Sequence, residues 1–410
     1  MVAIAPAGNA SGPATWTTRA AVIVGLCFAI NMADGMDVTI LSFIAPRLQD
    51  EWGIGPDTMG NLFSAGLLGM AIGGMGIAPL ADRFGRRRLI LLALILMSCG
   101  MIASGFSRSV AQLFILRVVV GAGIGTVLAT MAALAAESAP PAKRDFAVGM
   151  VQAGYPLAAV FTGLVTAQLL PIYGWQTLLV GAGVITVALF PLAWFLLPKN
   201  VPNAQASGQP SIRVSALFVP DYRGRTFALW LAVFFGLMVL YFIVSWIPKL
   251  AIEAGLSETN GIYAGALYNF GAFCGTTAMA LLASRLPLKR IVPTMLLCAV
   301  AAMMVFATVE MSVVGTLFVA FLIGVTLQGG YNGVWPIAAG AYPADRRATG
   351  IGWAIGIGRS GAILGPLMGG YLMAANASLP LLFGAYCVPL VLCAVCASLV
   401  RKDEEAIDRN

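Results

Sequence analysis

Long apolar runs separated by short polar segments dominate the hydropathy pattern of this 410-residue chain. Each run is about 20 residues long, which is the length an α-helix needs to cross roughly 30 Å of hydrocarbon. Glycine and proline occur inside the runs, as they commonly do in membrane helices. We therefore predict an all-α membrane protein with twelve transmembrane helices over residues 20–43, 60–80, 89–107, 111–134, 146–170, 177–197, 226–247, 259–282, 291–309, 313–340, 349–372 and 379–400.

The longest polar interval lies between the sixth and seventh spans, at roughly residues 198–225, and contains PKNVPNAQASGQPSIRV. Such a composition is typical of a linker. We predict an N-terminal six-helix bundle over residues 1–198, a cytoplasmic linker over 199–225 and a C-terminal six-helix bundle over 226–410.

The two bundles share a short sequence echo. LADRFGRRR at 80–88 follows the second span, and LASRLPLKR at 282–290 follows the eighth, with Leu, Ala, Arg and two terminal basic residues aligned at one offset. The echo favours two pseudo-symmetric halves with a substrate site between them, which is a transporter architecture. Chance similarity between two basic loops is the alternative.

Charge is scarce and unevenly placed. The chain is 60% hydrophobic and 10% charged, against about 25% charged residues in a soluble domain. If the N-terminus is cytoplasmic, most of the 24 lysines and arginines fall in cytoplasmic segments, as the positive-inside rule requires. This placement predicts a multi-pass membrane protein with both termini cytoplasmic, and it explains the net charge of +7 without a nucleic-acid partner.

Three ionisable residues in the first half stand out because a charge inside a span costs about 2.5–3.5 kcal/mol on insertion scales. Asp34 and Asp37 share one face of the first span, and Arg117 lies in the fourth. Two acids close together in a low dielectric cannot easily both ionise, and the chain has no histidine to carry protons. We predict that Asp34, Asp37 and Arg117 couple transport to protons, the alternatives being a packing ion pair and an interfacial arginine.

Arg359 lies near the middle of the eleventh span, and no acid of the second half lies at a similar depth. A guanidinium fork suits a carboxylate, so we predict that Arg359 binds an anionic substrate. The alternative is an ion pair with Asp34 or Asp37 across the two halves. Aromatic rings and amides inside or near the spans would suit a planar organic acid. The alternative is that these rings serve packing, as most rings in membrane spans do. The predicted substrate ligands besides Arg359 are Tyr155, Tyr241, Gln328, Tyr331, Asn332 and Trp335.

A charged cluster follows the second span. Asp82 lies beside Arg83 and Arg86, and Glu137 ends the fourth span. We predict that these four residues form a cytoplasmic gating network, in which Asp82 acts as a latch near the N-terminus of the eleventh-span helix.

Residues 73–88 (GGMGIAPLADRFGRRR) closely resemble the signature loop between helices two and three of the major facilitator superfamily. The segment Asp34-Gly35-Met36-Asp37 resembles the D-G-x-D signature of its aromatic acid:proton symporters. Arg117, Glu137 and the segments 245–248 and 358–361 are also similar to that family. Some members carry a histidine in the second half, and this chain has none.

The resemblance implies proton-driven uptake of a benzoate-like or related carboxylate across a bacterial inner membrane, by alternating access and by a monomer. It also implies that Asp34 and Asp37 are essential for transport, and that Asp82 helps to hold the outward-facing state. Rival functions are a symporter for sugar acids or other organic anions and a proton-driven efflux antiporter. A membrane enzyme or receptor is disfavoured, since the sequence shows no nucleophile–base set, metal-spaced cluster or nucleotide loop, and we expect no cofactor or metal.

Overall fold

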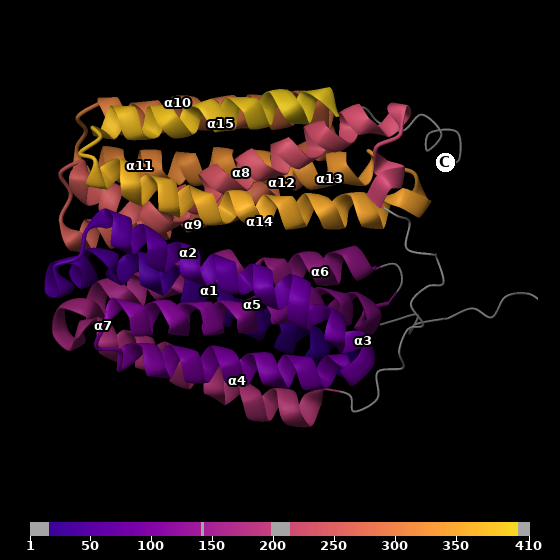
Figure 1. Ribbon diagram of the computed structural model, residues 1–410, viewed down its shortest axis with the longest axis horizontal. Helices are drawn as coiled ribbons and strands as arrows, with labels where there is room; N and C mark the ends of the chain where they lie inside the picture. The colour runs from indigo at the N-terminus through magenta and orange to yellow at the C-terminus, as the bar shows by residue number, and fades with distance from the viewer. Residues whose placement is uncertain (1–15, 141–142, 198–213, 401–410) are drawn as a thin grey trace, which may run out of the picture.

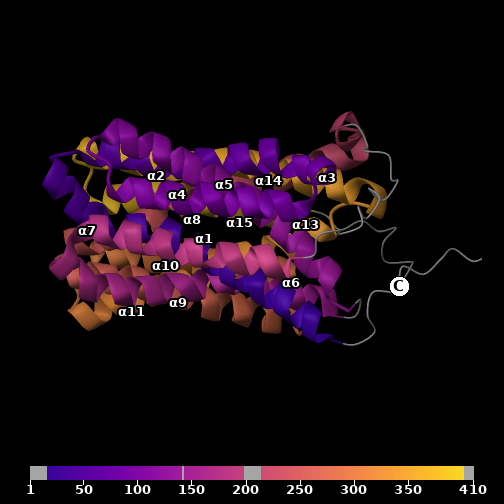
Figure 2. The same ribbon diagram turned by 90° about the horizontal axis from the view of Figure 1, so that it is seen from below.

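The computed structural model describes residues 16–140, 143–197 and 214–400; within these ranges, the side chains of Asp82, Asp145, Ala344, Asp345 and Ala348 are not described. The described chain is helical throughout, as predicted, and its long helices run roughly parallel to one another (Figure 1). Helices α1 to α7 form one layer, here called the first half, and α8 to α15 form the other, the second half. The view from below shows the same parallel arrangement (Figure 2).

The first half begins with α1, which is capped by the Thr17 hydroxyl and ends at Gly53, a residue in the left-handed conformation. Its elements are α1 (Thr18–Trp52), α2 (Pro56–Ile72), the π-helix η1 (Gly73–Ile77), the 3₁₀-helix η2 (Ala78–Leu80), α3 (Ala81–Phe84), α4 (Arg86–Gly105), α5 (Val110–Ser138), α6 (Arg144–Gln152) and α7 (Gly154–Leu196).

The second half begins with a short 3₁₀-helix and then α8, which starts at Pro220, before the predicted span and inside the predicted linker. Its elements are η4 (Val214–Leu217), α8 (Pro220–Glu253), α9 (Glu258–Ala283), α10 (Leu288–Thr308), α11 (Val313–Ile323), the π-helix η5 (Gly324–Gln328), α12 (Gly329–Asn332), α13 (Val334–Ala339), α14 (Ala344–Ala374) and α15 (Leu379–Leu399).

Ten helical segments of the described chain are long and apolar enough to cross a membrane. One of them, Phe146–Leu196, contains both the fifth and sixth predicted spans, because the backbone leaves helical geometry only at Gly174 (φ 72°, ψ 171°). The longer loop expected between residues 170 and 177 is therefore reduced to this one break. The eleventh predicted span is α14, which is 31 residues long and is not among the ten. Together these segments correspond to the twelve predicted spans.

Glycines allow α2 and α5 to touch through their backbones. A side chain at Gly69 would collide with the carbonyl of Val118, one at Gly73 with Ala122, and one at Gly121 with Gly66. Small residues at helix interfaces permit such close approach, which is how membrane helices gain packing contacts in lipid.

The same three contacts recur in the second half between α9 and the α11–η5 helix. Side chains at Gly271, Gly275 and Gly324 would collide with the carbonyls of Phe321, Val325 and Tyr268. Residues 66, 69 and 73 map onto 268, 271 and 275 at the offset that aligns LADRFGRRR with LASRLPLKR. The echo between the halves is therefore matched by an equivalent pair of helix contacts. On this basis we propose that the chain consists of two related six-helix bundles, as predicted, with the linker between them ending before α8 begins at Pro220 and not at residue 225.

Helices α1, α2 and α7 of the first half meet α8, α9 and α14 of the second. The hydrogen bonds that cross between the halves in the described chain lie toward the end that contains Gly174, here called the Gly174 end. Ser42 donates to the carbonyls of Val244 and Ser245, Ser64 donates to that of Ile363, and Gln168 donates to Tyr263. The opposite end, where α3 lies, is here called the α3 end (Figure 1). Hydrogen bonds thus join the two halves at the Gly174 end.

Candidate functional site

The centre of the site is a buried ion pair between α1 and α5. Arg117 Nη1 donates to Asp37 Oδ1 over 2.8 Å, and Arg117 Nη2 donates to the Ser104 hydroxyl of α4 over 3.2 Å. Arg117 is 2% exposed and Asp37 4% exposed, so neither side chain reaches the membrane interface. This geometry identifies Asp37 as the acid that pairs with Arg117 and excludes an interfacial arginine.

Asp34, one turn earlier on α1, lies in a different environment. It is 2% exposed, and its Oδ1 atom has no hydrogen-bond partner. No cation lies within ion-pair distance of it in the part of the chain that the structure describes. The backbone of Tyr155 passes against Gly35, because a side chain at Gly35 would collide with the Tyr155 carbonyl. Asp34 is thus the buried acid of the site that no cation of the described chain holds.

Arg359 lies on the face of α14 that meets α2. Its neighbours one turn away on this face are Gly356, which lies near Met75, and Ile363, whose carbonyl accepts from Ser64. Arg359 is only half-buried, and its charge acts through space on Asp34 and on Tyr241. Its side chain hydrogen-bonds with that of Tyr241 and makes no ion pair with either aspartate in this structure.

A cavity lies beside the Asp37–Arg117 pair and takes its walls from both halves. It holds about 390 Å³ of empty volume, part of it open to solvent. The lining residues come from α1, α2, α5 and α8: Asp37, Val38, Leu41, Phe63, Gly66, Leu67, Met70, Arg117, Ile124, Tyr241 and Ser245. Two charged groups, one phenol and one serine in an otherwise apolar wall fit an amphipathic ligand better than a polyhydroxylated one.

The predicted aromatic and amide ligands divide into two groups. Tyr155 and Tyr241 are half-buried and lie near one another and near Asp34. Tyr331 lies near Tyr241 and Arg359. These three residues surround the charged centre.

The other three predicted ligands are engaged within the second half. Gln328 donates to Asn332, and Asn332 donates to Thr276 of α9. Trp335 packs edge-on against Tyr331, with 5.9 Å between ring centroids. Their predicted contact with substrate therefore stays a prediction.

The predicted gating residues lie at the α3 end. Arg86 of α4 forms an ion pair with Glu137 of α5, within the first half. Arg83 is exposed and stacks over Phe84 at 5.4 Å from the ring centroid. The Asp82 side chain lies outside what the structure describes, so its predicted latch to the eleventh span stays a prediction.

Several residues of the site escaped the sequence analysis. Phe63 and Leu67 line the cavity, and Ser104 holds Arg117 in place. Apolar wall residues carry no signal in an apolar chain. Ser104 could have been noticed as a hydroxyl near the end of the third predicted span, but helix serines more often bond their own backbone.

Comparison with known proteins agrees with this fold. The model of the Major Facilitator Superfamily matches residues 27–341. The chain is 31% identical to a gallate transporter of Pseudomonas putida, with 88% of this chain and 87% of the relative covered, and 32% identical to a 4-hydroxybenzoate transporter of the same organism, with 91% and 90% covered.

Among solved structures, a D-xylose-proton symporter superposes with a TM-score of 0.77 at 14% identity, over 93% of this chain and 97% of the symporter. That likeness shows the fold alone. The resemblance seen in residues 73–88 is confirmed by the family match, and a transporter family leaves no place for the enzyme alternative. The chain belongs to the Major Facilitator Superfamily, as a multi-pass membrane transporter related to bacterial carriers of aromatic acids.

Proposed function

We propose that the protein is a proton-coupled symporter that imports an aromatic carboxylate. The observation that carries the proposal is the unequal state of the two aspartates. Asp37 is held by Arg117, whereas Asp34 is buried without a partner and faces the field of the half-buried Arg359. Aromatic acids are the cargo named for its relatives, and the apolar cavity wall suits a planar ring.

Charge balance explains how such a site couples two ligands. With Asp34 ionised, the two aspartates balance Arg117 and Arg359, and the four charges of the empty site sum to zero. A proton on Asp34 leaves the positive charge of Arg359 uncompensated, and a substrate carboxylate restores the balance. The empty and fully loaded carriers then rearrange more easily than a carrier with one ligand, which is what symport requires.

The charge pattern supports one orientation of the carrier in the membrane. Positive-inside placement assigns the α3 end to the cytoplasm, with both termini on that side of a bacterial inner membrane. The Gly174 end then faces outward, and it is an end at which the two halves are in contact in this structure. A monomer contains all the residues that this mechanism uses.

Reconstituted transport tests the proposal. Purified full-length protein in liposomes with an inward proton gradient should accumulate labelled 4-hydroxybenzoate, and a protonophore should abolish the accumulation. Gluconate serves as the sugar-acid control and should not compete. Accumulation that survives the protonophore would remove proton coupling, and uptake of gluconate in place of the aromatic acid would replace the substrate class.

A further inference from the structure

Two tyrosine hydroxyls near the charged centre have no partner. Tyr268 of α9 is 0% exposed and Tyr331 of α12 is 3% exposed, and neither hydroxyl forms a hydrogen bond in the described chain. A buried hydroxyl without a partner costs about 1–3 kcal/mol, so native proteins rarely keep one without a reason. Other buried tyrosines follow the rule: Tyr342 donates to Thr226, and Tyr386 donates to the Gly365 carbonyl.

Both tyrosines belong to the neighbourhood of the proposed substrate site. Tyr331 interacts electrostatically with Arg359 and Tyr241, and its ring packs on Gly236 of α8. Tyr268 interacts with Tyr155, as do Asp34 and Asp37. The two tyrosines therefore lie near the groups assigned to the carboxylate and the proton.

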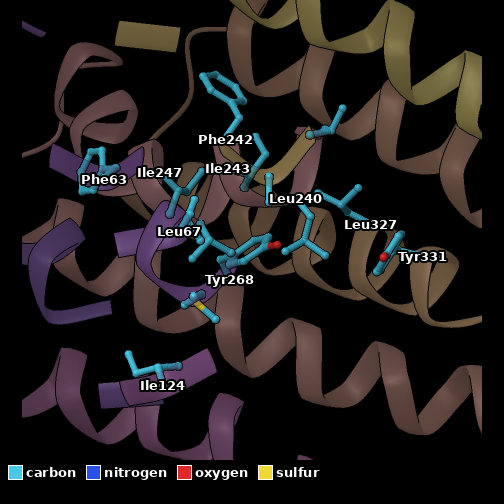
Figure 3. Packing of buried hydrophobic residues seen from close by; sticks show 14 of the residues in the cluster. Phe63, Leu67, Ile124, Leu240, Phe242, Ile243, Ile247, Tyr268, Leu327 and Tyr331 are labelled. Atoms are coloured by element: carbon cyan, nitrogen blue, oxygen red, sulfur yellow. The ribbon is translucent and has the colours of Figure 1, made fainter. Parts of the chain in front are cut away.

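The pseudo-symmetry of the fold places Tyr268 independently. The Tyr268 carbonyl packs against Gly324 in the second half, and the Gly66 carbonyl packs against Gly121 in the first. Gly66 lines the central cavity. Tyr268 thus occupies the second-half position equivalent to a cavity-lining residue. Figure 3 shows the Tyr268 hydroxyl directed toward Leu240, and this hydroxyl has no hydrogen-bond partner in the described chain.

We propose that the hydroxyls of Tyr268 and Tyr331 recognise a ring hydroxyl of the substrate, so that the carrier prefers hydroxylated aromatic acids to benzoate. The inference rests on the proposed function and adds a specificity site to it. Arg359 would hold the carboxylate, and the phenols would supply hydrogen bonds that benzoate cannot use. A site built to bond a hydroxyl rejects the analogue that lacks it, because its own polar groups are then left unpaired.

Tyr268→Phe and Tyr331→Phe test the proposal, since each removes one oxygen and leaves the ring. Initial rates of proton-driven uptake are measured for 4-hydroxybenzoate, 3,4-dihydroxybenzoate and benzoate in proteoliposomes. We expect the wild-type protein to favour at least one hydroxylated acid by roughly tenfold in kcat/KM over benzoate. At least one of the two variants should lose most of that preference, measured as the ratio of kcat/KM for the hydroxylated acid to kcat/KM for benzoate.

The matched control is Tyr386→Phe, which removes a buried hydroxyl that already has a protein partner. It should change uptake of all three acids alike. Thermal shift of the purified full-length variants with each acid provides a second readout that does not depend on turnover. The two test variants should be at least as stable as wild type without ligand, because they lose no internal hydrogen bond.

The outcomes separate the two proposals. The specificity site would be overturned if the wild-type protein transported benzoate and the hydroxylated acids equally well. It would also be overturned if both variants kept the full preference. Either result would leave the symport proposal standing. A wild-type protein that carries none of the three acids would overturn the proposed function, and the specificity site with it.

Discussion

Arg47 of α1 and Glu258 of α9 form a two-pronged ion pair between the halves. Arg47 Nε donates to Glu258 Oε1 over 3.1 Å, and Nη2 donates to Oε2 over 2.7 Å. Phe63 and Trp246 stack edge-on nearer the cavity, with 5.0 Å between centroids, and also join the two halves. A charged and an aromatic contact thus add to the hydrogen bonds that join the halves at the Gly174 end.

Breaking the Arg47–Glu258 pair should shift the carrier toward its outward-open state. The side chains are 41% and 32% exposed, so the pair contributes at most about 1 kcal/mol, equivalent to roughly a fivefold change in the equilibrium. In Arg47→Ala we expect faster labelling of a cysteine placed at the cavity residue Val38 by an impermeant maleimide added from the Gly174 end. Lys249→Ala is the control, because the Lys249–Glu253 contact lies within α8; equal labelling in both variants would contradict the prediction.

The buried Asp37–Arg117 pair should behave as a unit in stability measurements. Removing one partner leaves an uncompensated buried charge, at a cost of about 3–5 kcal/mol. We expect Asp37→Asn and Arg117→Gln each to lower the melting temperature of the purified protein strongly, and the double variant to lower it by less than the sum. Additive effects in this double-mutant cycle would show that the two groups do not interact.

Asp34→Asn should separate proton coupling from substrate movement. Asparagine resembles the protonated carboxyl group in shape but cannot release a proton, so the variant should exchange substrate across the membrane and fail to accumulate it. Its exchange rate should also lose its dependence on pH. Counterflow and gradient-driven uptake measure the two activities, and an equal loss of both would argue that Asp34 serves structure alone.

Arg359→Lys keeps the charge but removes the planar fork that suits a carboxylate. We expect a loss of at least tenfold in kcat/KM for 4-hydroxybenzoate, and a larger loss in Arg359→Gln. Arg108→Gln changes an exposed arginine and should have no effect. Unchanged carboxylate transport in both Arg359 variants would place the anion elsewhere.

The glycine contacts should be equally important in both halves. Gly121→Ala and Gly324→Ala place a methyl group against the carbonyls of Gly66 and Tyr268, and overpacking of this kind costs about 1–3 kcal/mol. Both should lower the melting temperature. Gly181→Ala is the control, because nothing lies within 4 Å of its added carbon; a similar loss there would show that helix glycines matter for another reason.

The membrane spans were predictable because each depends on a local property. A helix satisfies its own backbone hydrogen bonds, so in lipid a run of about 20 apolar residues is sufficient to specify one. The exact ends were less predictable: α1 continues to Trp52 past the predicted end at residue 43, and α7 breaks only at Gly174. These ends depend on caps and on contacts with neighbouring helices.

Charge made part of the site visible in the sequence. Asp34, Asp37, Arg117 and Arg359 were recognisable because an ionisable group inside a span is costly and needs a reason. The sequence by itself thus determined the membrane class, the helical segments, the echo between the halves and the identity of the charged groups.

Only the tertiary structure decided how those groups are paired. Arg117 binds Asp37 and leaves Asp34 alone, Arg86 meets Glu137 within one half, and Arg47 meets Glu258 across the two. Each pairing depends on how closely two distant helices approach and how each is rotated, which backbone contacts such as Gly121 with Gly66 help to set. Spacing along one helix carries no information about those rotations, so the partners and the unpartnered tyrosines became visible only once the helices were packed.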